Sequence, residues 1–425
     1  MLLPRSVAKN NMKKPILSLL LTLYTAVLRF LRVLKLGGNQ DLSVLILPPA
    51  ALGSLGDEAM VSASIEYFRD KGAKKIGLIS YGSISGWENY RPATGTVDLR
   101  HHYFRGFWKG KFHFAQVVSG YKRFYCLGAD VMDGYYSEFD TLQRLSLVAL
   151  AAKTGADAAV LGFSFNNQPK PACVQAFRDL PSAVSLCARD PVSHERLVHH
   201  LNRPVKLVAD LAFLLHPAND SEIASSVVEW IGEQRSQNRS VIGVNANYKL
   251  VQSLEVQSLD NLTEIYVDTL SELYAKNNQF SFVLISHDFR NIKGEVNDVV
   301  LSEAIWKALP TEIQSHCIKV PSPCSAAEIK AIGGDLDIVL SGRMHLAIAC
   351  LGQGTPAACI TYQGKFEGLF RHFGLEGMNI EPAQALQPKN LVEFLIPLID
   401  RQAEIRQHIQ LKLPQVQQLA HTNFE

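Results

Sequence analysis

The stretch LDIVLSGRMHLAIACLGQGTPAACIT, residues 336–361, contains three apolar runs separated by two short polar or glycine-rich segments. Residues 336–340 form an apolar run of strand length, and residues 345–351 form an apolar run that suits a helix. Gly354 and Pro356 end that helix, and residues 357–361 are apolar again. This order predicts a strand, a helix and a second, parallel strand, which is the repeating unit of a sheet covered by helices.

The same alternation recurs along the whole chain, without an internal repeat at the 20–50-residue scale. It predicts an α/β protein with two doubly wound, Rossmann-like domains facing a cleft. The predicted strands cover residues 42–47, 75–80, 123–127, 158–163, 183–187 and 205–209, then 241–245, 280–286, 336–340 and 357–361. The predicted helices cover residues 58–71, 143–154, 262–277, 326–332, 345–351 and most of 391–413.

A chain of 425 residues exceeds one ordinary hydrophobic core, which also favours two domains. The polar stretch at residues 216–221 is the best candidate for the boundary. The predicted parts are therefore an N-terminal segment at 1–40, domains at 41–220 and 221–390, and a C-terminal helical segment at 391–425.

Composition excludes several classes of protein. Hydrophobic residues make up 47% and charged residues 19%, which indicates a globular chain and not a disordered one. A net charge of +2 gives no support to nucleic-acid binding. The seven cysteines include no C-x-x-C pair, so we expect reduced, mostly buried thiols in the cytoplasm and neither a disulfide framework nor a metal site.

The first 40 residues combine an apolar run, ILSLLLTLYTAVL at 16–28, with basic residues on both sides. Residues 13–36 thus fit a helix that lies on a membrane surface with a basic stripe beside an apolar face. Two other interpretations stay open, a helix packed on the domain surface and an uncleaved anchor. The basic residues are Lys13, Lys14, Arg29, Arg32 and Lys35.

Polar residues follow several predicted strands, where open parallel sheets bind their ligands. After the first strand, Gly53, Ser54 and Gly56 precede Asp57 and Glu58 at the start of a helix. Glycines and a free helix N-terminus can bind an anion closely. The alternative is a turn in which Asp57 or Ser54 caps the helix.

Two further strand ends leave their roles open. Arg189 is either the salt-bridge partner of Asp190 or an anion-binding cation directed into the cleft. His287 and Asp288 are a general base, a pair that binds a sugar hydroxyl, or structural residues satisfied by their neighbours.

Arg343 and His345 flank the start of the helix that follows residues 336–340. A helix N-terminus carries a partial positive charge, and arginine adds a planar fork that suits carboxylate or phosphate. The imidazole adds a proton that can be donated near neutral pH. We therefore predict a site for a small, highly charged anion, against the simpler alternative of a surface Arg and a core His.

Taken in order, these motifs resemble the polysaccharide pyruvyl transferase family over about residues 43–380. The sequence departs from the family pattern at Ser54, often Asn there, and at residues 128–130, where the family often has a run of glycines. The segments that carry the resemblance are Gly53–Glu58, Ala188–Asp190 with Ser193, Ile285–Asp288, Ser341–His345, Gly354–Pro356, Tyr362–Gly368 and Gly374–Leu375.

The resemblance implies a fold like that of the two-domain GT-B glycosyltransferases. It implies transfer of the pyruvyl group of phosphoenolpyruvate to a saccharide, as a ketal, in cell-surface polysaccharide biosynthesis. Phosphate is released and no cofactor or metal takes part. Residues 221–390 would then hold phosphoenolpyruvate, and residues 41–220 the acceptor.

The resemblance also assigns expected roles. His345 is the acid or polarises the phosphate, and Arg343 and Arg189 bind phosphoenolpyruvate. The base stays open among Asp57, Glu58, Asp130 and Asp288. The further expected substrate-binding residues are Gly53, Gly56, Glu58, His287 and Lys365.

Two other functions fit the same architecture, a nucleotide-sugar glycosyltransferase and a catalytically silent binding protein. On the favoured interpretation the enzyme is cytoplasmic and peripheral on the inner face of the plasma membrane. A lipid-linked saccharide acceptor would make the segment 13–36 useful as a membrane contact.

Overall fold

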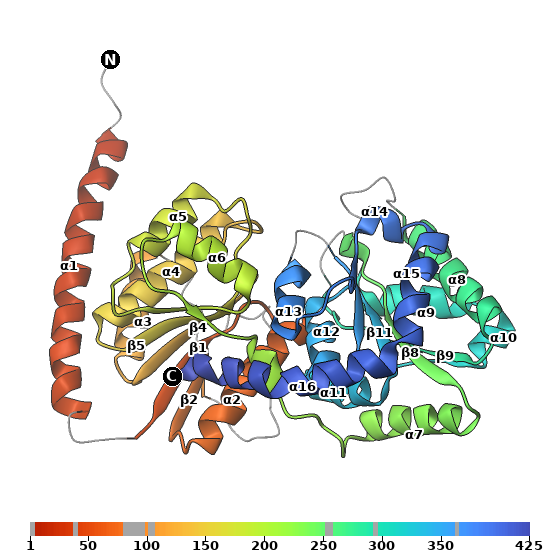
Figure 1. Ribbon diagram of the computed structural model, residues 1–425. Coiled ribbons are helices and arrows are strands. Elements are labelled where there is room, and N and C mark those ends of the chain that lie inside the picture. Colours follow the sequence, from red (N-terminus) through yellow and green to blue (C-terminus); the bar gives the residue numbers. More distant parts are fainter. Residues whose placement is uncertain are drawn as a thin grey trace. The chain divides into compact units, whose positions relative to one another are not determined.

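The computed structural model describes residues 5–36, 41–79, 98–100, 107–250, 258–291, 296–361 and 365–425. The chain forms two compact units, each built on one sheet (Figure 1). Unit 1 consists of Met1–Ala51, Ser64–Ala188 and His194–Lys206, and unit 2 of Leu52–Ala63, Arg189–Ser193 and Leu207–Glu425.

This division differs from the linear boundaries expected at residues 220 and 390. Leu52–Ala63 and Arg189–Ser193, which follow strands of unit 1, group with unit 2. The backbone explains the first case, because Leu55 N donates to His287 O at 3.2 Å within unit 2. The C-terminal segment also belongs to unit 2.

The sheet of unit 1 has seven strands in the order β3-β2-β1-β4-β5-β6-β7, and β1 to β6 pair in parallel. The order reverses between β1 and β4. These strands are β1 (Ser43–Leu47), β2 (Lys75–Ile79), β3 (Asp98–Arg100), β4 (Arg123–Ala129), β5 (Asp157–Phe163), β6 (Ser185–Ala188) and β7 (Lys206–Leu207).

Both faces of this sheet are buried, as its apolar strands require. Alternate residues such as Leu45, Phe124 and Val160 join the core formed with α3 to α6. On the other face, Tyr125 stacks on Phe68 of α2. The helices are α1 (Arg5–Leu36), α2 (Leu55–Asp70), α3 (Phe107–Val118), α4 (Glu138–Lys153), α5 (Pro171–Arg178) and α6 (Pro191–His200).

The sheet of unit 2 has six parallel strands in the order β10-β9-β8-β11-β12-β13. Here the order reverses between β8 and β11, where Asn245 lies opposite Ser341. A reversal of this kind is where doubly wound sheets bind ligands. The strands are β8 (Ser240–Asn245), β9 (Phe280–Leu284), β10 (Cys317–Lys319), β11 (Ile338–Ser341), β12 (Ala357–Ile360) and β13 (Asn379–Ile380).

Helices connect and cover these strands. The longer ones are α7 (Glu222–Ser236), α8 (Leu259–Lys276), α9 (Asp298–Ala308), α11 (Ala326–Asp335), α12 (Met344–Leu351), α13 (Lys365–Phe373), α15 (Pro388–Asp400) and α16 (Gln402–His421). Short turns complete the unit: η2 (Leu211–Leu214), η3 (Tyr248–Leu250), α10 (Thr311–Gln314), α14 (Pro382–Ala385) and η4 (Thr422–Phe424).

The prediction of an α/β protein with two Rossmann-like domains is confirmed. Most predicted elements occur within a few residues of their expected ends. The helix predicted from residue 58 begins one turn earlier, at Leu55, because Ser54 O accepts from Glu58 N. The predicted helix at 391–413 is two helices, and they meet at Arg401, while Pro397 and Pro414 lie inside them. Ser80, at the end of one predicted strand, lies outside the described residues.

Candidate active site

Two segments that are more than 200 residues apart in sequence pair at the carboxyl end of β9. Ser54 forms an antiparallel bridge with Asp288, and Phe289 N donates to Gly53 O at 2.8 Å. The glycine-rich turn after β1 is therefore part of unit 2, directly beside the His287–Asp288 strand end. The predicted motifs at 53–58 and 285–288 belong to one site.

Glycine is required at two positions of this turn. Gly53 has φ +104°, and a Cβ there would lie 3.0 Å from Cγ of Arg290. A Cβ on Gly56 would lie 2.2 Å from Nδ1 of His345. The N-terminus of α2 thus rests against the imidazole of His345, and only a residue without a side chain allows that approach.

His345, in the first turn of α12, faces a buried carboxylate. Its Nε2 lies 3.5 Å from Oδ2 of Asp210, and makes no hydrogen bond to another described residue. Asp210 Oδ2 also accepts from Nη1 of Arg189 at 3.0 Å. Asp210 therefore links the predicted acid to a predicted anion-binding arginine.

Asp210 stays ionised in this setting. Burial by itself raises the pKa of a carboxyl, but His345, Arg189 and the backbone N–H of Ala212 lower the pKa of Asp210 to about 2. Helix α13 supports the arginine, because His372 Nε2 lies 2.9 Å from Arg189 O. Asp190 caps α6 by accepting from Ser193 N at 2.7 Å.

Arg343, the N-cap residue of α12, lies in a second charged cluster. It donates to both oxygens of Asp298, at 2.5 and 3.2 Å, and to Asp288 at 3.2 Å. Asp298 is fully buried and also accepts from Asn245 Nδ2 at 3.0 Å, at the end of β8. This bidentate pair fixes the plane of the Arg343 guanidinium.

Asp288 is held by two arginines, since Arg290 Nη2 donates to it at 2.6 Å in addition to Arg343. Burial alone would raise the pKa of Asp288, but the hydrogen bonds from Arg290 and the charge of Arg343 lower it. A carboxylate with a low pKa and guanidiniums on its oxygens is a weak base. The geometry therefore favours a positioning role for Asp288.

His287 is buried beside the same cations. Burial lowers its pKa, and the neighbouring His345 and Arg343 lower it further, to about 3. Its imidazole is therefore neutral at physiological pH. Its backbone N–H donates to Asp298 at 3.0 Å, so it also helps to fix that carboxylate.

Glu58 differs from the other carboxylates. Its Oε1 accepts from the N–H of Ala326, at the N-terminus of α11, at 3.2 Å. Burial raises its pKa to about 7, even though this hydrogen bond acts in the opposite direction, and Glu328 adds to the rise. Glu58 can therefore gain or lose a proton near neutral pH, as a general acid or base requires.

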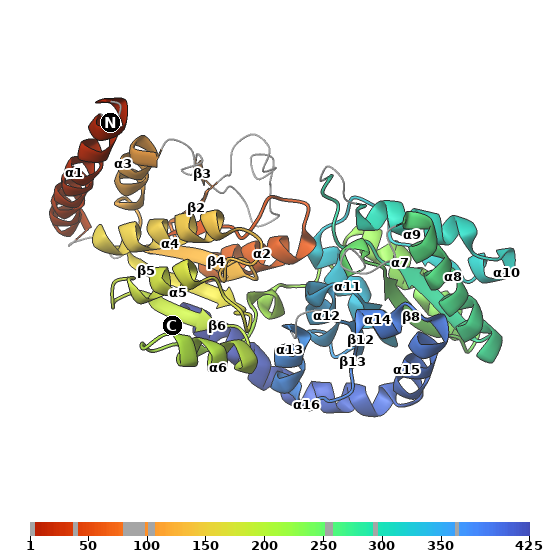
Figure 2. The ribbon, with the colours of Figure 1, turned by 90° about the horizontal axis from the view of Figure 1, so that it is seen from above.

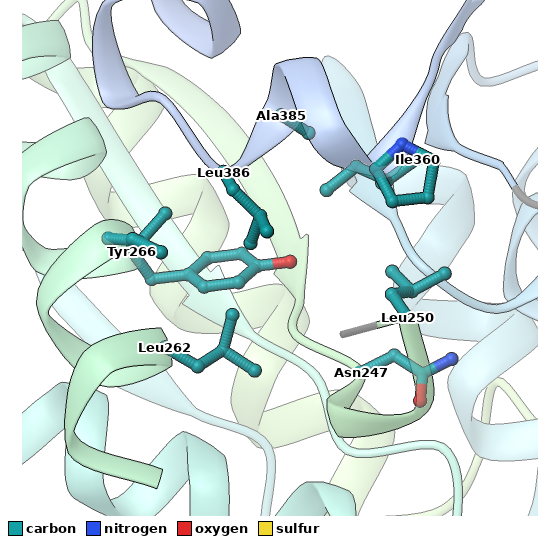
Figure 3. A pocket seen from close by; sticks show the side chains of 9 residues that line it. Asn247, Leu250, Leu262, Tyr266, Ile360, Ala385 and Leu386 are labelled. Atoms are coloured by element: carbon teal, nitrogen blue, oxygen red, sulfur yellow. The ribbon is translucent and has the colours of Figure 1, made fainter. Parts of the chain in front are cut away.

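Unit 2 also contains a small apolar pocket, shown in Figure 3. Its lining contains no cationic side chain, and its polar groups are the amide of Asn247 and the hydroxyl of Tyr266. Such a lining does not suit a doubly charged anion. The apolar lining residues are Leu250, Leu262, Ile265, Ile360, Pro382, Ala385 and Leu386.

Residues 55–364 match the sequence profile of the family described as polysaccharide pyruvyl transferase. The chain belongs to the polysaccharide pyruvyl transferase family. It is accordingly a transferase, as predicted. A search of curated proteins found no match.

Solved structures of low sequence identity share the fold of this pyruvyl transferase family member. S. aureus MnaA, solved with UDP, has a TM-score of 0.56 at 12% identity, over 88% of this chain and 92% of that one. A UGT transferase from Siraitia grosvenorii has a TM-score of 0.55 at 12% identity, over 90% and 98%. Anabaena HepE has 0.54 at 15% identity, over 89% and 98%. At these identities the likeness shows the GT-B fold alone.

Most of the residues predicted for the pyruvyl transferase site come together in unit 2. Arg189 and His345 meet at Asp210, Arg343 and Asp288 share an ion-pair cluster, and Gly56 contacts His345. Asp57 lies partly buried in the first turn of α2. Lys365 begins α13, and its side chain lies outside the described residues, as do Tyr362–Gly364 of the predicted motif.

Sequence reasoning missed Asp210, Asp298 and Asn245. Asp210 follows the predicted strand at residues 205–209 and caps η2, so an acidic residue after a predicted strand was the available signal. Asp298 begins α9 after its cap Asn297. The local sequence around Asp210 and Asp298 does not indicate that each will pair with an arginine far away in the chain.

Proposed function

We propose that this chain transfers the pyruvyl group of phosphoenolpyruvate to a saccharide, forming a ketal and releasing phosphate. One observation carries the proposal beyond membership of the family. Buried His345 Nε2, without a hydrogen bond to a described residue, lies 3.5 Å from Asp210, which also binds Arg189, and Arg343 two residues earlier is held by Asp298.

The donor suits this arrangement. Phosphoenolpyruvate carries a carboxylate and a phosphate on a three-carbon frame, and guanidiniums bind both groups through charge-assisted hydrogen bonds. Asp210 and Asp298 orient the two guanidiniums in advance. The N-terminus of α12, where Arg343 and His345 lie, adds N–H groups and a favourable dipole.

The reaction needs one proton delivered and two removed. In the proposed sequence, His345 donates its proton to the methylene carbon, and it recovers a proton from solvent after the product leaves. The central carbon then accepts one sugar hydroxyl oxygen, and the second hydroxyl oxygen displaces phosphate. The two hydroxyl protons pass to a base and to the departing phosphate.

Glu58 is the base that we favour among the carboxylates named from sequence. Its pKa of about 7 lets it accept a proton and release it again near neutral pH. Asp288 is less suited because it is paired with Arg290 and Arg343.

An aromatic surface of unit 1 supports a saccharide acceptor. Tyr135, Tyr136 and Phe139, which follow the carboxyl end of β4, are exposed by 54, 48 and 62%. Aromatic faces pack against the apolar C–H faces of sugar rings, and carboxylates accept hydrogen bonds from hydroxyls. Asp130, which accepts from Tyr136 Oη at 3.0 Å, supplies such a carboxylate.

The test is to incubate the purified chain with phosphoenolpyruvate and a panel of saccharides and to measure released phosphate and product mass. Phosphate release with a pyruvylated product is expected. His345→Ala should lower turnover by about 10²-fold or more, the usual scale for a positioned acid. Arg343→Lys should also lower it, because a point charge does not replace a bidentate fork.

Thermal shift with phosphoenolpyruvate and with a nucleoside diphosphate distinguishes the other functions. Stabilisation by the nucleoside diphosphate alone would identify a nucleotide-sugar glycosyltransferase and overturn the proposal. No ligand response and no phosphate release with any acceptor would identify a silent binding protein.

A further inference from the structure

Helix α1 packs along one side against the rest of unit 1, next to α3 and α4 (Figure 2). Leu21, Tyr24 and Leu28 contact the core of the unit, and the ring of Tyr24 lies 5.4 Å from that of Phe112. These residues are three or four apart, so they form one face of the helix. That face is part of the domain.

Arg32 holds the same face in place. It is 9% exposed, and its guanidinium donates to Val118 O at 3.4 Å and to Lys122 O at 3.0 Å. The segment Pro15–Leu34 is long and apolar enough to cross a membrane. Crossing would require the helix to leave these partners and uncover the apolar core beneath it. The contacts therefore favour a helix that lies along the domain.

The opposite side of α1 is an exposed apolar stripe. At 100° per residue, Leu19, Leu23 and Phe30 point away from the packed face, and Val27 lies beside them. A contiguous apolar surface of this kind marks a contact with a membrane or a partner. The stripe consists of Ile16, Leu19, Leu20, Leu23, Val27, Phe30, Leu31, Val33 and Leu34, exposed by 40 to 66%.

A pocket opens between α1, α3 and α4, at the packed side of the helix. Its volume is about 210 Å³, the space of about seven water molecules at roughly 30 Å³ each. Lys111 of α3 and Lys153 of α4 line it, and no acidic side chain does among the described residues. The other lining residues are Ser18, Leu21, Thr22, Thr25, Trp108, Ser146, Ala149 and Leu150.

Two lysines in one pocket favour an anion. Burial lowers the pKa of Lys111, and the charge of Lys153 lowers it further, so the two ammonium groups repel each other. A phosphate between them would remove that repulsion, and the hydroxyl of Ser18 can donate to its oxygens.

The position of the pocket relative to the stripe favours a lipid headgroup, and not a soluble anion, as the source of the phosphate. An interfacial helix buries its apolar face by roughly 5–10 Å, and a helix is about 10–12 Å across. When the stripe enters the bilayer, the packed side of α1 lies at the depth of the lipid phosphates. We propose that α1 lies in the membrane interface and that the Lys111–Lys153 pocket binds the phosphate headgroup of an anionic lipid. This proposal does not depend on the pyruvyl transfer reaction.

The experiment is flotation of the full chain with vesicles of phosphatidylcholine, or of phosphatidylcholine mixed with phosphatidylglycerol. Lys111→Gln/Lys153→Gln should weaken binding to the anionic vesicles by about 30-fold, because two charges near the surface contribute roughly 1 kcal/mol each, and it should weaken binding more than its control does. The control is Lys109→Gln/Lys74→Gln, which removes the same charge at exposed positions of unit 1. Equal losses in both variants would mean diffuse attraction and would overturn the pocket assignment.

A second variant tests the stripe. Leu23→Glu/Val27→Glu changes exposed positions only, so folding is preserved, and it should abolish flotation with both kinds of vesicle. Normal flotation would overturn the membrane contact. Alkaline carbonate should release the wild-type chain from membranes, whereas a chain that resists extraction would have α1 spanning the bilayer.

Inorganic phosphate separates a lipid from a soluble ligand. Phosphate alone should leave the melting temperature of the wild type and of the lysine variant equally unchanged. A shift in the wild type only, together with equal vesicle binding by both, would assign the pocket to a soluble anion and overturn the lipid assignment.

Discussion

At the residue scale, the chemistry of the candidate site depends on how carboxylates are paired. Asp210 and Asp298 are both buried and both bound to arginines, and their charges are thereby compensated. Glu58 lies in a different environment, because burial and the charge of Glu328 both raise its pKa. Asp210 and Asp298 position arginines, whereas Glu58 is a carboxyl group that titrates near neutral pH.

Asp210→Asn tests the positioning of His345. The change keeps the shape of the side chain but removes the charge that faces Nε2 at 3.5 Å. We expect turnover in the phosphate-release assay to fall by roughly 10²-fold or more. Asp260→Asn, at an exposed position of α8, is the control and should keep wild-type turnover. Wild-type turnover of a folded Asp210→Asn protein would exclude the proposed link.

Glu58→Gln tests the raised pKa through stability. The folded state holds the Glu58 proton up to about pH 7, whereas the ordinary value is 4.5, so stability falls as pH rises through this window. Because glutamine cannot ionise, the variant should gain on the order of 1–3 kcal/mol in free energy of unfolding relative to wild type between pH 4.5 and pH 8. Urea unfolding at the two pH values measures the difference.

The exposed change Glu233→Gln on α7 is the matched control for Glu58→Gln. It should shift the free energy of unfolding by the same small amount at both pH values. If Glu58→Gln behaves in the same way, the carboxyl of Glu58 has an ordinary pKa and is a poor candidate for the base.

At the scale of elements, helix N-termini meet at this site. Helix α2 approaches His345 through Gly56, α11 donates to Glu58, and α12 carries Arg343 and His345. Each terminus adds a partial positive charge to a region that is proposed to hold an anion. The close approach of α2 is the most specific of these contacts, because it excludes every residue except glycine.

Gly56→Ala should therefore displace the imidazole. The new Cβ would lie 2.2 Å from Nδ1 of His345. A misplacement of about 1 Å costs about 10²-fold in rate, so a loss of that order is expected in turnover. Gly232→Ala on α7 is the control, because a Cβ there meets nothing within 4 Å. It should raise the free energy of unfolding by about 1 kcal/mol and leave turnover unchanged. Unchanged turnover in Gly56→Ala would contradict the arrangement.

At the scale of the whole molecule, the proposed donor residues all belong to unit 2. Arg189 and the turn at Gly56 are contributed by Arg189–Ser193 and Leu52–Ala63, two segments that follow strands of unit 1. The chain therefore passes between the units several times.

Hydrogen exchange of the full chain tests this assignment. Phosphoenolpyruvate should slow exchange in residues 52–63, 189–193 and 341–351 of unit 2, because ligand binding stabilises the segments that hold it. Exchange in α3 and α4 of unit 1 should not change. Protection confined to unit 1 would contradict the assignment of the donor site.

The sequence determined the elements and several of the site residues. Residues 336–361 have their apolar runs, glycine and proline in the order that a strand–helix–strand unit requires, and β11, α12 and β12 form there. Such signals are local, because the backbone geometry of a strand or helix determines how often a side chain returns to the same face. For the same reason Arg343 and His345 could be recognised as a pair at one strand–helix junction.

Only the tertiary structure decided which of these residues meet. Arg189, Asp210 and His345 are separated by up to 156 positions along the chain, as their numbers show, yet Asp210 contacts both of the others. The tertiary structure also decided that the pKa of Asp210 is lowered and that of Glu58 is raised. A pKa depends on burial and on charges in segments that are distant in sequence. The spacing of apolar residues along the local sequence determines whether a segment forms a strand or a helix. The partner of a buried charge depends instead on how distant elements pack together.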